Sequence, residues 1–316
     1  MSETFSMLEP TLFRHLRSCQ RVLIAGAGGG FDVYAGLPLA LALWNRGQEV
    51  HLANLSFSYL ESTDADQPSR GLFRVEPGTR MGAARGARDY FPERSLAQFL
   101  EQEKRPSTVW AFTKAGVDQL RASYQWLVDH LKLDAIVLVD GGTDILMFGD
   151  EISLGTPTED MSSLAAVGQL KLAHRHVACL GFGVDAYHGV SHGLVLENIA
   201  ALERDGAYHG AFSVSQFSSE GSTYLRAVEH TQRAHAHHPS IVNGSIAAAL
   251  KGEFGDVQFT ARTNDSELFI NPLMGLCARN TYVCELVNAP SPMHVSLLIE
   301  AAREGKKLRE AKPIPH

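Results

Sequence analysis

Acidic side chains are concentrated in one stretch of the chain. Seven acids and no lysine or arginine lie between Leu133 and Leu170, so this stretch alone accounts for the formal net charge of -7. Two of the acids, Asp140 and Asp144, enclose a short Gly-Gly-Thr turn that follows an apolar run. Carboxylate oxygens bind Mg²⁺, and a positioned carboxylate can also act as a general base. We therefore predict that Asp140 and Asp144 are catalytic and hold a divalent cation such as Mg²⁺, and that the ligand also contacts Gly141, Gly142 and Thr143.

A glycine-rich loop follows the first apolar run. The sequence Gly26-Ala-Gly-Gly-Gly30-Phe-Asp32 lets the backbone approach a ligand closely and precedes a predicted helix N-terminus, which favours anions. We predict a nucleotide-type ligand loop formed by Gly26, Gly28, Gly29, Gly30 and Asp32. Phe31 replaces the third glycine of the dinucleotide fingerprint, and Asn54 replaces the acid that normally ends the second strand, so an NAD site is not expected. The alternative is a tight turn whose glycines serve helix packing alone.

A third loop with polar side chains follows a later apolar run. It carries Asp185, His188 and His192. Gly189 and Gly193 disfavour a helix that would present both histidines to one metal ion. We predict proton transfer by His188 and ligand contacts from Asp185 and His192, with simple loop structure as the alternative.

The composition limits the class of protein. The chain has 316 residues, of which 45% are hydrophobic and 20% charged, as in ordinary globular proteins. The net negative charge argues against nucleic acid as a partner, and no apolar run reaches membrane-spanning length. With no signal peptide and no Cys-x-x-Cys pair, we expect a cytoplasmic protein whose partner is a small molecule; a homo-oligomer is compatible with the sequence. The role of the arginine-rich residues 70–94 is open between a lid over the ligand and a surface segment that pairs with acids.

Apolar runs alternate with amphipathic stretches along most of the chain, which predicts parallel strands joined by helices. We expect one domain over residues 1–316, with a doubly wound, mostly parallel, Rossmann-like sheet, helices on both faces and a loose tail at 303–316. Thr156 and Glu159 fit a capping box at the start of a helix at 157–172. The histidines at 235–238 are expected at a solvated helix end. The expected strands are 21–26, 49–54, 108–112, 135–139, 176–181, 256–261 and 281–286, and the other expected helices are 9–19, 31–46, 114–131, 194–204, 223–236, 241–250 and 293–303.

Four motifs together resemble a known family. They are Gly-Ala-Gly-Gly-Gly-Phe-Asp (26–32), Asp-Gly-Gly-Thr-Asp (140–144), Gly-Asp-Glu (149–151) and Gly-Thr-Pro-x-Glu-Asp (155–160). The combination resembles the family catalogued as domain of unknown function 1152, and Ile270-Asn-Pro-Leu-Met274 is a further anchor. The resemblance implies a Rossmann-like α/β fold and brings no established reaction.

Because the carboxyl ends of parallel strands meet at one sheet edge, the three loops should lie together. We expect an enzyme, a hydrolase or transferase, that acts on a small phosphorylated or nucleotide-like molecule through a divalent cation. One alternative is an enzyme whose amine-bearing substrate is bound directly by Asp140 or Asp144. A second is a non-catalytic binding or sensory module, and a hydride-transfer enzyme ranks third.

Overall fold

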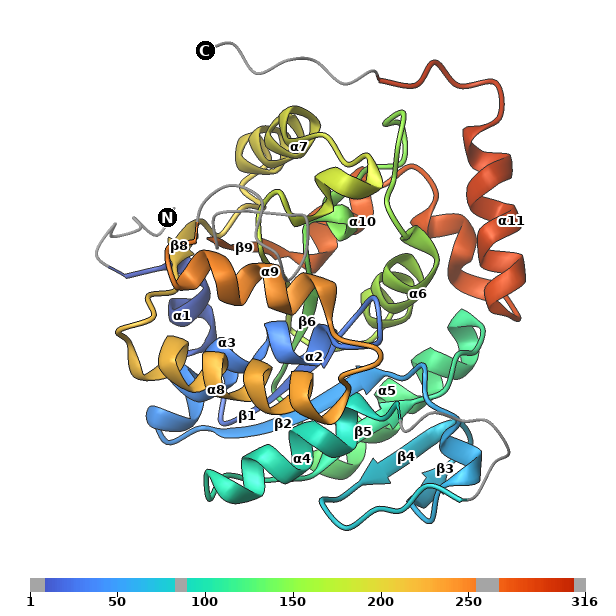
Figure 1. The fold of residues 1–316 in the computed structure, drawn as a ribbon. Coiled ribbons are helices and arrows are strands. Elements are labelled where there is room, and N and C mark those ends of the chain that lie inside the picture. The colour runs from blue at the N-terminus through green and yellow to red at the C-terminus, as the bar shows by residue number, and fades with distance from the viewer. Residues whose placement is uncertain (1–8, 83–89, 254–266, 310–316) are drawn as a thin grey trace.

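The computed structural model describes residues 9–82, 90–253 and 267–309, with the backbone only for residues 187, 188 and 267–275. Five parallel strands form the centre of one sheet, and their spatial order is that of a Rossmann-like fold (Figure 1). In that order they are β5 (Val109–Phe112), β2 (Glu49–Leu55), β1 (Arg21–Gly26), β6 (Ala135–Gly141) and β7 (His174–Leu180). The predicted α/β class is therefore confirmed.

Antiparallel strands extend the sheet at both edges. A hairpin of β3 (Asp66–Ser69) and β4 (Leu72–Val75) pairs with β5, whereas β9 (Glu267–Pro272) pairs with β7 and β8 (Ala211–Ser213) pairs with β9. The sequence did not predict β3 and β4, since β3 is short and polar and contains Pro68. Proline is tolerated there because β3 is an edge strand.

Helices cover both faces of the sheet because successive strand residues point to opposite sides. In β1, Leu23 packs into the apolar core on one side, and Ile24 into the core on the other. The first core includes α5 (Val117–Leu131), α6 (Pro157–Gly168), α7 (His192–Arg204), α10 (Leu273–Arg279) and α11 (Pro292–Arg303). The second includes α1 (Thr11–Leu16), α2 (Asp32–Ala35), α3 (Leu37–Asn45), α4 (Pro92–Gln102), α8 (Ser219–Ala234) and α9 (Ile241–Leu250).

Two predicted elements need correction. The helix expected to run to Arg46 is divided at Gly36, where a Cβ would lie 2.4 Å from Cγ2 of Ile24. The strand expected at residues 281–286 is wrong, because a 3₁₀ helix spans Val283–Asn288. There the side-chain oxygen of Asn280 accepts the N–H groups of residues 282 and 283, which fixes a turn. The strand expected at 256–261 lies outside the described residues.

Two surface features differ in part from the sequence-based expectation. His237 and His238 are exposed, as expected at a solvated helix end, but His235 is not. His235 is buried: its Nε2 accepts the N–H of Phe91 at 3.0 Å, and its Nδ1 lies 3.0 Å from the carbonyl oxygen of Thr231. This histidine joins α8 to the start of α4. The tail expected to be loose is held as far as Arg309, whose guanidinium group contacts Asp150 at 2.7 Å; residues 310–316 lie outside the described part of the chain.

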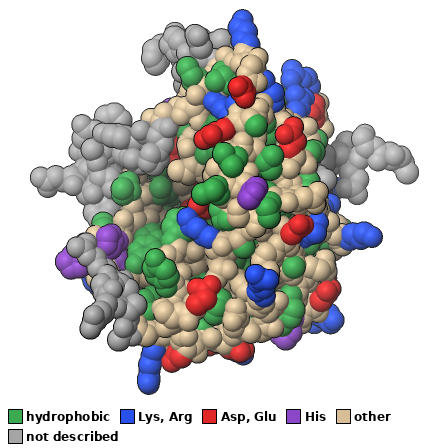
Figure 2. All heavy atoms as spheres, turned by 90° about the vertical axis from the view of Figure 1, so that its right-hand side faces the viewer, with side chains coloured by type: hydrophobic (Ala, Val, Ile, Leu, Met, Phe, Trp, Pro, Cys, Tyr) green, Lys and Arg blue, Asp and Glu red, His purple; other side chains and the backbone are tan. Residues whose placement is uncertain are grey.

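The described helices and one face of the surface relate to two expectations from the sequence, which concern membrane spans and nucleic-acid partners. None of the described helices has the length and apolar character that crossing a membrane requires. On the face in Figure 2, the coloured basic and acidic side chains are interspersed. The partners expected from the sequence stay predictions.

Candidate functional site

The site lies where the parallel strands change direction of winding. The chain leaves β1 for α2 on one face of the sheet and leaves the adjacent β6 for α6 on the other. Such a switch point opens a crevice at the carboxyl ends of the two strands, where open α/β sheets bind ligands. The glycine loop and the Asp-Gly-Gly-Thr-Asp turn are the loops at this point.

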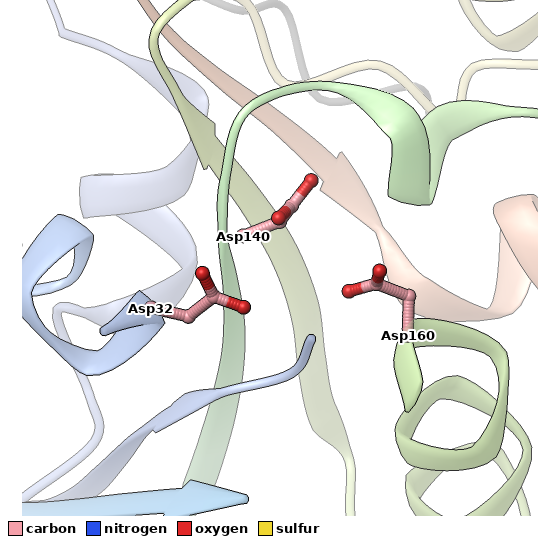
Figure 3. Close-up of side chains that lie close together, drawn as sticks. All are labelled: Asp32, Asp140 and Asp160. Carbon is pink, nitrogen blue, oxygen red and sulfur yellow. The ribbon is translucent and has the colours of Figure 1, made fainter. Parts of the chain in front are cut away.

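Three aspartates face one another there, each from a different element (Figure 3). Asp32 begins α2, Asp140 is near the end of β6, and Asp160 lies in the first turn of α6. One carboxylate oxygen from each lies within 4.8 Å of the others. We call these residues the aspartate triad. Its convergence gives a geometry in which one cation can contact three carboxylates.

The triad is buried in a way that disfavours negative charge. Asp140 is 3% exposed and Asp160 is 1% exposed, whereas Asp32 keeps part of its surface accessible. Burial, followed by repulsion from neighbouring aspartates, raises the pKa of all three carboxyls well above the ordinary value.

The protein supplies few compensating groups. Asp32 accepts the backbone N–H groups of Gly141 and Gly28, which partly offset the rise in its pKa. By contrast, Oδ1 of Asp160 is buried and has no hydrogen-bond partner within the described part of the chain. Among the described residues, no lysine, arginine or histidine forms an ion pair with any member of the triad. A buried carboxylate in this condition is costly unless a proton or an external cation satisfies it.

Asp144, expected to be a metal ligand together with Asp140, is not a member of the triad. Its Oδ2 accepts the backbone N–H of Thr156 at 2.8 Å and lies 3.1 Å from the Thr156 hydroxyl. Asp144 therefore joins its own turn to the start of α6, while its charge still raises the pKa of Asp32, Asp140 and Asp160. The capping box expected at this helix is wrong, since Thr156 makes no capping bond and Glu159 pairs instead with Lys114 at 2.8 Å.

Asp185 lies beside the same turn, as expected, and serves its backbone. Its Oδ2 accepts the N–H of Thr143 at 2.6 Å, and a Cβ on Gly142 would lie 2.3 Å from that oxygen. Gly142 also has a φ of +133°, which requires glycine. Asp185 thus fixes the conformation of the turn that carries Asp140.

In the glycine loop, Gly28 packs against the triad, and several amides at this edge of the sheet donate within the protein. A Cβ on Gly28 would lie 2.6 Å from Oδ2 of Asp32 and 2.8 Å from Oδ1 of Asp160. Gly29 and Gly30 have φ values of +92° and +63°. Several amides that could hold a phosphate donate within the protein: Gly28 and Gly141 to Asp32, Gly30 to the Leu55 oxygen, Gly142 to the Leu180 oxygen and Thr143 to Asp185.

Asn54, noted in the sequence only because it is not acidic, holds the glycine loop in place. Its side-chain nitrogen donates to the carbonyl oxygen of Gly30 at 2.8 Å and to Oε1 of Glu93 at 2.6 Å. A Cβ on Gly26 would lie 2.2 Å from Oδ1 of Asn54, so Gly26 packs against this residue. Glu93 is fully buried, and burial raises its pKa to about 7. The sequence did not reveal Glu93 because an acid in the first turn of a helix is ordinary.

The two histidines expected in the third loop are not brought into the triad by any described contact. His192 is the first residue of α7, and its Nε2 lies 3.4 Å from the carbonyl oxygen of Gly183. The backbone of His188 ends a 3₁₀ helix that spans Val184–His188, and its side chain lies outside the described atoms. Proton transfer by His188 stays a prediction.

Asp160 is the triad member to which the sequence assigned no role. A signal was present, because Asp160, Leu164 and Val167 share the i, i+4, i+7 spacing of the buried face of α6. An acid in the apolar face of a helix must find a partner or a function. The sequence pattern instead predicted a capping role for its neighbour Glu159.

Comparison with known proteins agrees with the resemblance drawn from the motifs. No curated protein shows a match to the chain. The model of the family described as "Protein of unknown function (DUF1152)" matches residues 23–305, which include the whole triad and the loops around it. The chain therefore belongs to this family of proteins of unknown function.

Proposed function

We propose that this protein is an enzyme that binds a divalent cation at the aspartate triad and acts on a small phosphorylated or nucleotide-like molecule, by hydrolysis or group transfer. The convergence of three carboxylates, two of them buried, with no basic partner among the described residues carries the proposal. Oxygen-only ligand sets favour hard cations, and Mg²⁺ or Mn²⁺ is the natural choice.

The cation also explains how an anionic substrate could approach this acidic site. Asp32, Asp140 and Asp160 repel phosphate, and the nearby amides that donate within the protein are not available to hold it. A divalent ion would offset the repulsion and give the phosphate oxygens a ligand partner. It would also stabilise the charge that develops during phosphoryl or related group transfer.

The chain's own residues would then divide the work. Asp140 and Asp160 would hold the ion from two elements, together with Asp32, the most exposed member of the triad. Gly28 leaves room because it has no side chain between Asp32 and Asp160. Asp144 and Asp185 keep the turn in shape from outside the triad.

The same carboxylates support a second candidate, an enzyme for an amine-bearing substrate. A protonated amine would satisfy buried carboxylates without any metal ion. The unpartnered oxygen of Asp160 is the observation that favours it, because that atom could accept an N–H directly. A sensory module would use either ligand and return it unchanged.

Thermal unfolding with added ligands distinguishes the cation-dependent enzyme, the enzyme for an amine-bearing substrate and the sensory module. We expect Mg²⁺ or Mn²⁺ alone to raise the melting temperature, and phosphorylated compounds to add a further rise only when the cation is present. A ligand at a hundredfold excess over its Kd raises the free energy of unfolding by about 2.7 kcal/mol. A rise with amines that needs no cation would support the second candidate, and ligand recovered unchanged after long incubation would support a sensory module.

A matched pair of glycine variants tests where the ion binds. In Gly28→Val the added side chain would meet the Asp32 and Asp160 carboxylates, so the cation-dependent rise should disappear. The control is Gly78→Val, because a Cβ at Gly78 meets nothing within 4 Å. An unchanged response to Mg²⁺ and Mn²⁺ in folded Gly28→Val would overturn the proposed cation site.

A further inference from the structure

A second cluster of ligand-capable side chains lies at the opposite end of the sheet. A cavity of about 970 Å³ there is lined by four histidines: His15, His174, His176 and His209. His174 and His176 are at the start of β7, whereas the aspartate triad lies at the carboxyl ends of the strands. The site proposed above uses none of these four histidines.

The fold explains why the four rings meet. His174 and His176 are two residues apart on β7, so their side chains point to the same face. His15 comes from α1, and His209 comes from the segment just before β8. Side chains from three separate parts of the chain thus converge, although no two of those parts are adjacent in sequence.

Three of the four rings, those of His15, His176 and His209, are separated by about the distances of imidazoles around one ion, whereas His174 lies further out, 6.5 Å from His15. The centroid of His15 lies 4.6 Å from that of His209 and 5.7 Å from that of His176, and the last two rings are 5.2 Å apart. His174 lies 6.2 Å from His176. Zn–N bonds of about 2.0–2.1 Å in a tetrahedral site put ring centroids about 5 Å apart. The backbone therefore holds three of the rings near the spacing that such a site needs, while the ring nitrogens would still have to turn toward one point, because among the described residues only the aspartate triad brings three ligand atoms within 4.8 Å of one another.

The buried ring of His176 is an independent observation that points to a ligand in this cavity. It is 4% exposed, and neither ring nitrogen has a hydrogen-bond partner among the residues that the structure describes. A buried imidazole normally satisfies at least one nitrogen, because an unsatisfied buried polar group costs about 1–3 kcal/mol. A metal ion bound by the neutral imidazoles of His176 and His209 would satisfy such a nitrogen.

We propose that His15, His174, His176 and His209 form a binding site for a divalent transition-metal ion of the Zn²⁺ class. Imidazole nitrogens prefer such borderline ions, whereas the carboxylate oxygens of the triad prefer Mg²⁺ or Mn²⁺. Rotation of the rings about χ2, which has a broad energy profile, would turn the nitrogens toward one point without moving the backbone. The protein would then hold two different metals at the two ends of one sheet.

The experiment uses full-length protein without a histidine tag. Isothermal titration with Zn²⁺ should show one site whose affinity falls at least about 10-fold in His209→Ala and in His174→Ala, the lower limit for losing even an outer-shell partner. His237→Ala, which removes an exposed histidine outside the cavity, is the matched control and should bind normally. Asp140→Asn should also bind Zn²⁺ normally, because the triad is a separate site.

Two further measurements test the proposed metal site independently of Zn²⁺ affinity. Bound Co²⁺ should show the intense visible absorption of tetrahedral nitrogen coordination, which the two cavity variants should lose. His176→Phe should abolish metal binding and leave the metal-free protein at least as stable, since it removes two unsatisfied nitrogens. No Zn²⁺ binding, binding unchanged in the cavity variants, or a weak octahedral Co²⁺ spectrum would each overturn the proposal, even if one variant failed to fold.

Discussion

The acidic stretch from residue 133 to 170 supplies two kinds of buried carboxylate. Glu151 is fully buried, yet Arg309 lies 2.7 Å from it, and it accepts bonds from the N–H of Phe148 and from the Asn198 side chain. Asp140 and Asp160 are almost as buried but have no basic partner among the described residues. Residues of one charge and one segment thus occupy opposite electrostatic environments.

The difference shows what burial of charge can be used for. Around Glu151, the protein satisfies the carboxylate itself, so the group holds the 148–151 loop to Arg309 and to α7. In the aspartate triad the protein leaves the charge unsatisfied, and the pKa of each carboxyl is raised. Satisfied charge stabilises structure, whereas unsatisfied charge is available to bind a cation.

The largest effect on stability should come from Glu151→Gln. Removing the charge weakens the hydrogen bonds that Glu151 accepts from Phe148 and Asn198, and bonds to a charged group contribute about 1.5–3 kcal/mol, while Arg309 keeps Asp150 as a partner. Denaturant unfolding should show this loss, while cation binding by the folded fraction stays normal. Asp150→Asn, at a side chain 35% exposed, is the control and should cost much less. A fully stable Glu151→Gln protein would erase the distinction between the two kinds of carboxylate.

The largest effect on activity should come from Asp140→Asn. Turnover of a substrate identified by the ligand screen should fall at least ~100-fold, or about 2.7 kcal/mol. Stability without metal should hold or increase, because one of several repelling buried carboxylates becomes neutral. Asp144→Asn is the control: weakening its bonds to Thr156 should cost on the order of 1 kcal/mol, with near-normal turnover per folded molecule. The reverse pattern would make Asp144 the catalytic residue.

The unsatisfied carboxyls should also set the pH dependence of stability. A folded-state pKa above the unfolded value means that the folded protein binds more protons, so stability is greatest at low pH and falls as pH rises. For Glu93 the loss should occur between about 4.5 and about 7. Metal-free wild-type protein should therefore lose stability with rising pH more steeply than Glu93→Gln or Asp160→Asn.

Added Mg²⁺ should reverse this slope, because metal binding requires deprotonated carboxylates and strengthens with pH. Melting temperatures measured across pH 4–8 with and without Mg²⁺ provide the check. Identical pH profiles for wild type and both variants would show that burial does not raise the pKa of these carboxyls.

The smallest effect should come from Glu159→Gln. Glu159 pairs with Lys114, whose side chain is 45% exposed, and such pairs contribute about 0–1 kcal/mol. Urea unfolding should place the variant within that range, with turnover unchanged. Lys114→Gln should give an equally small change, since it breaks the same pair. A large loss of turnover in Glu159→Gln would place this residue in the catalytic machinery instead.

Local sequence patterns determined most of the central fold. The apolar runs of β1, β2, β6 and β7 and the one-face pattern of α5 predicted the α/β class, because strand and helix periodicities are written in neighbouring residues. The glycine loop and the Asp-Gly-Gly-Thr-Asp turn marked the edge of the sheet where the site lies. The sequence also identified Asp32 and Asp140 as functional candidates, although Asp32 was expected only to contact a ligand.

Only the tertiary structure decided which acids act together. Asp160 joins Asp32 and Asp140 because α6 packs on one face of the sheet and α2 on the other, with β6 between them. Asp144 lies closer to Asp140 in sequence, yet its carboxylate bonds to Thr156 and is not one of the three that converge. Net charge and spacing reveal that carboxylates are near one another, but their pKa values and partners depend on contacts across more than a hundred residues. Glu151 shows the same dependence, because its partner Arg309 is 158 residues away along the chain.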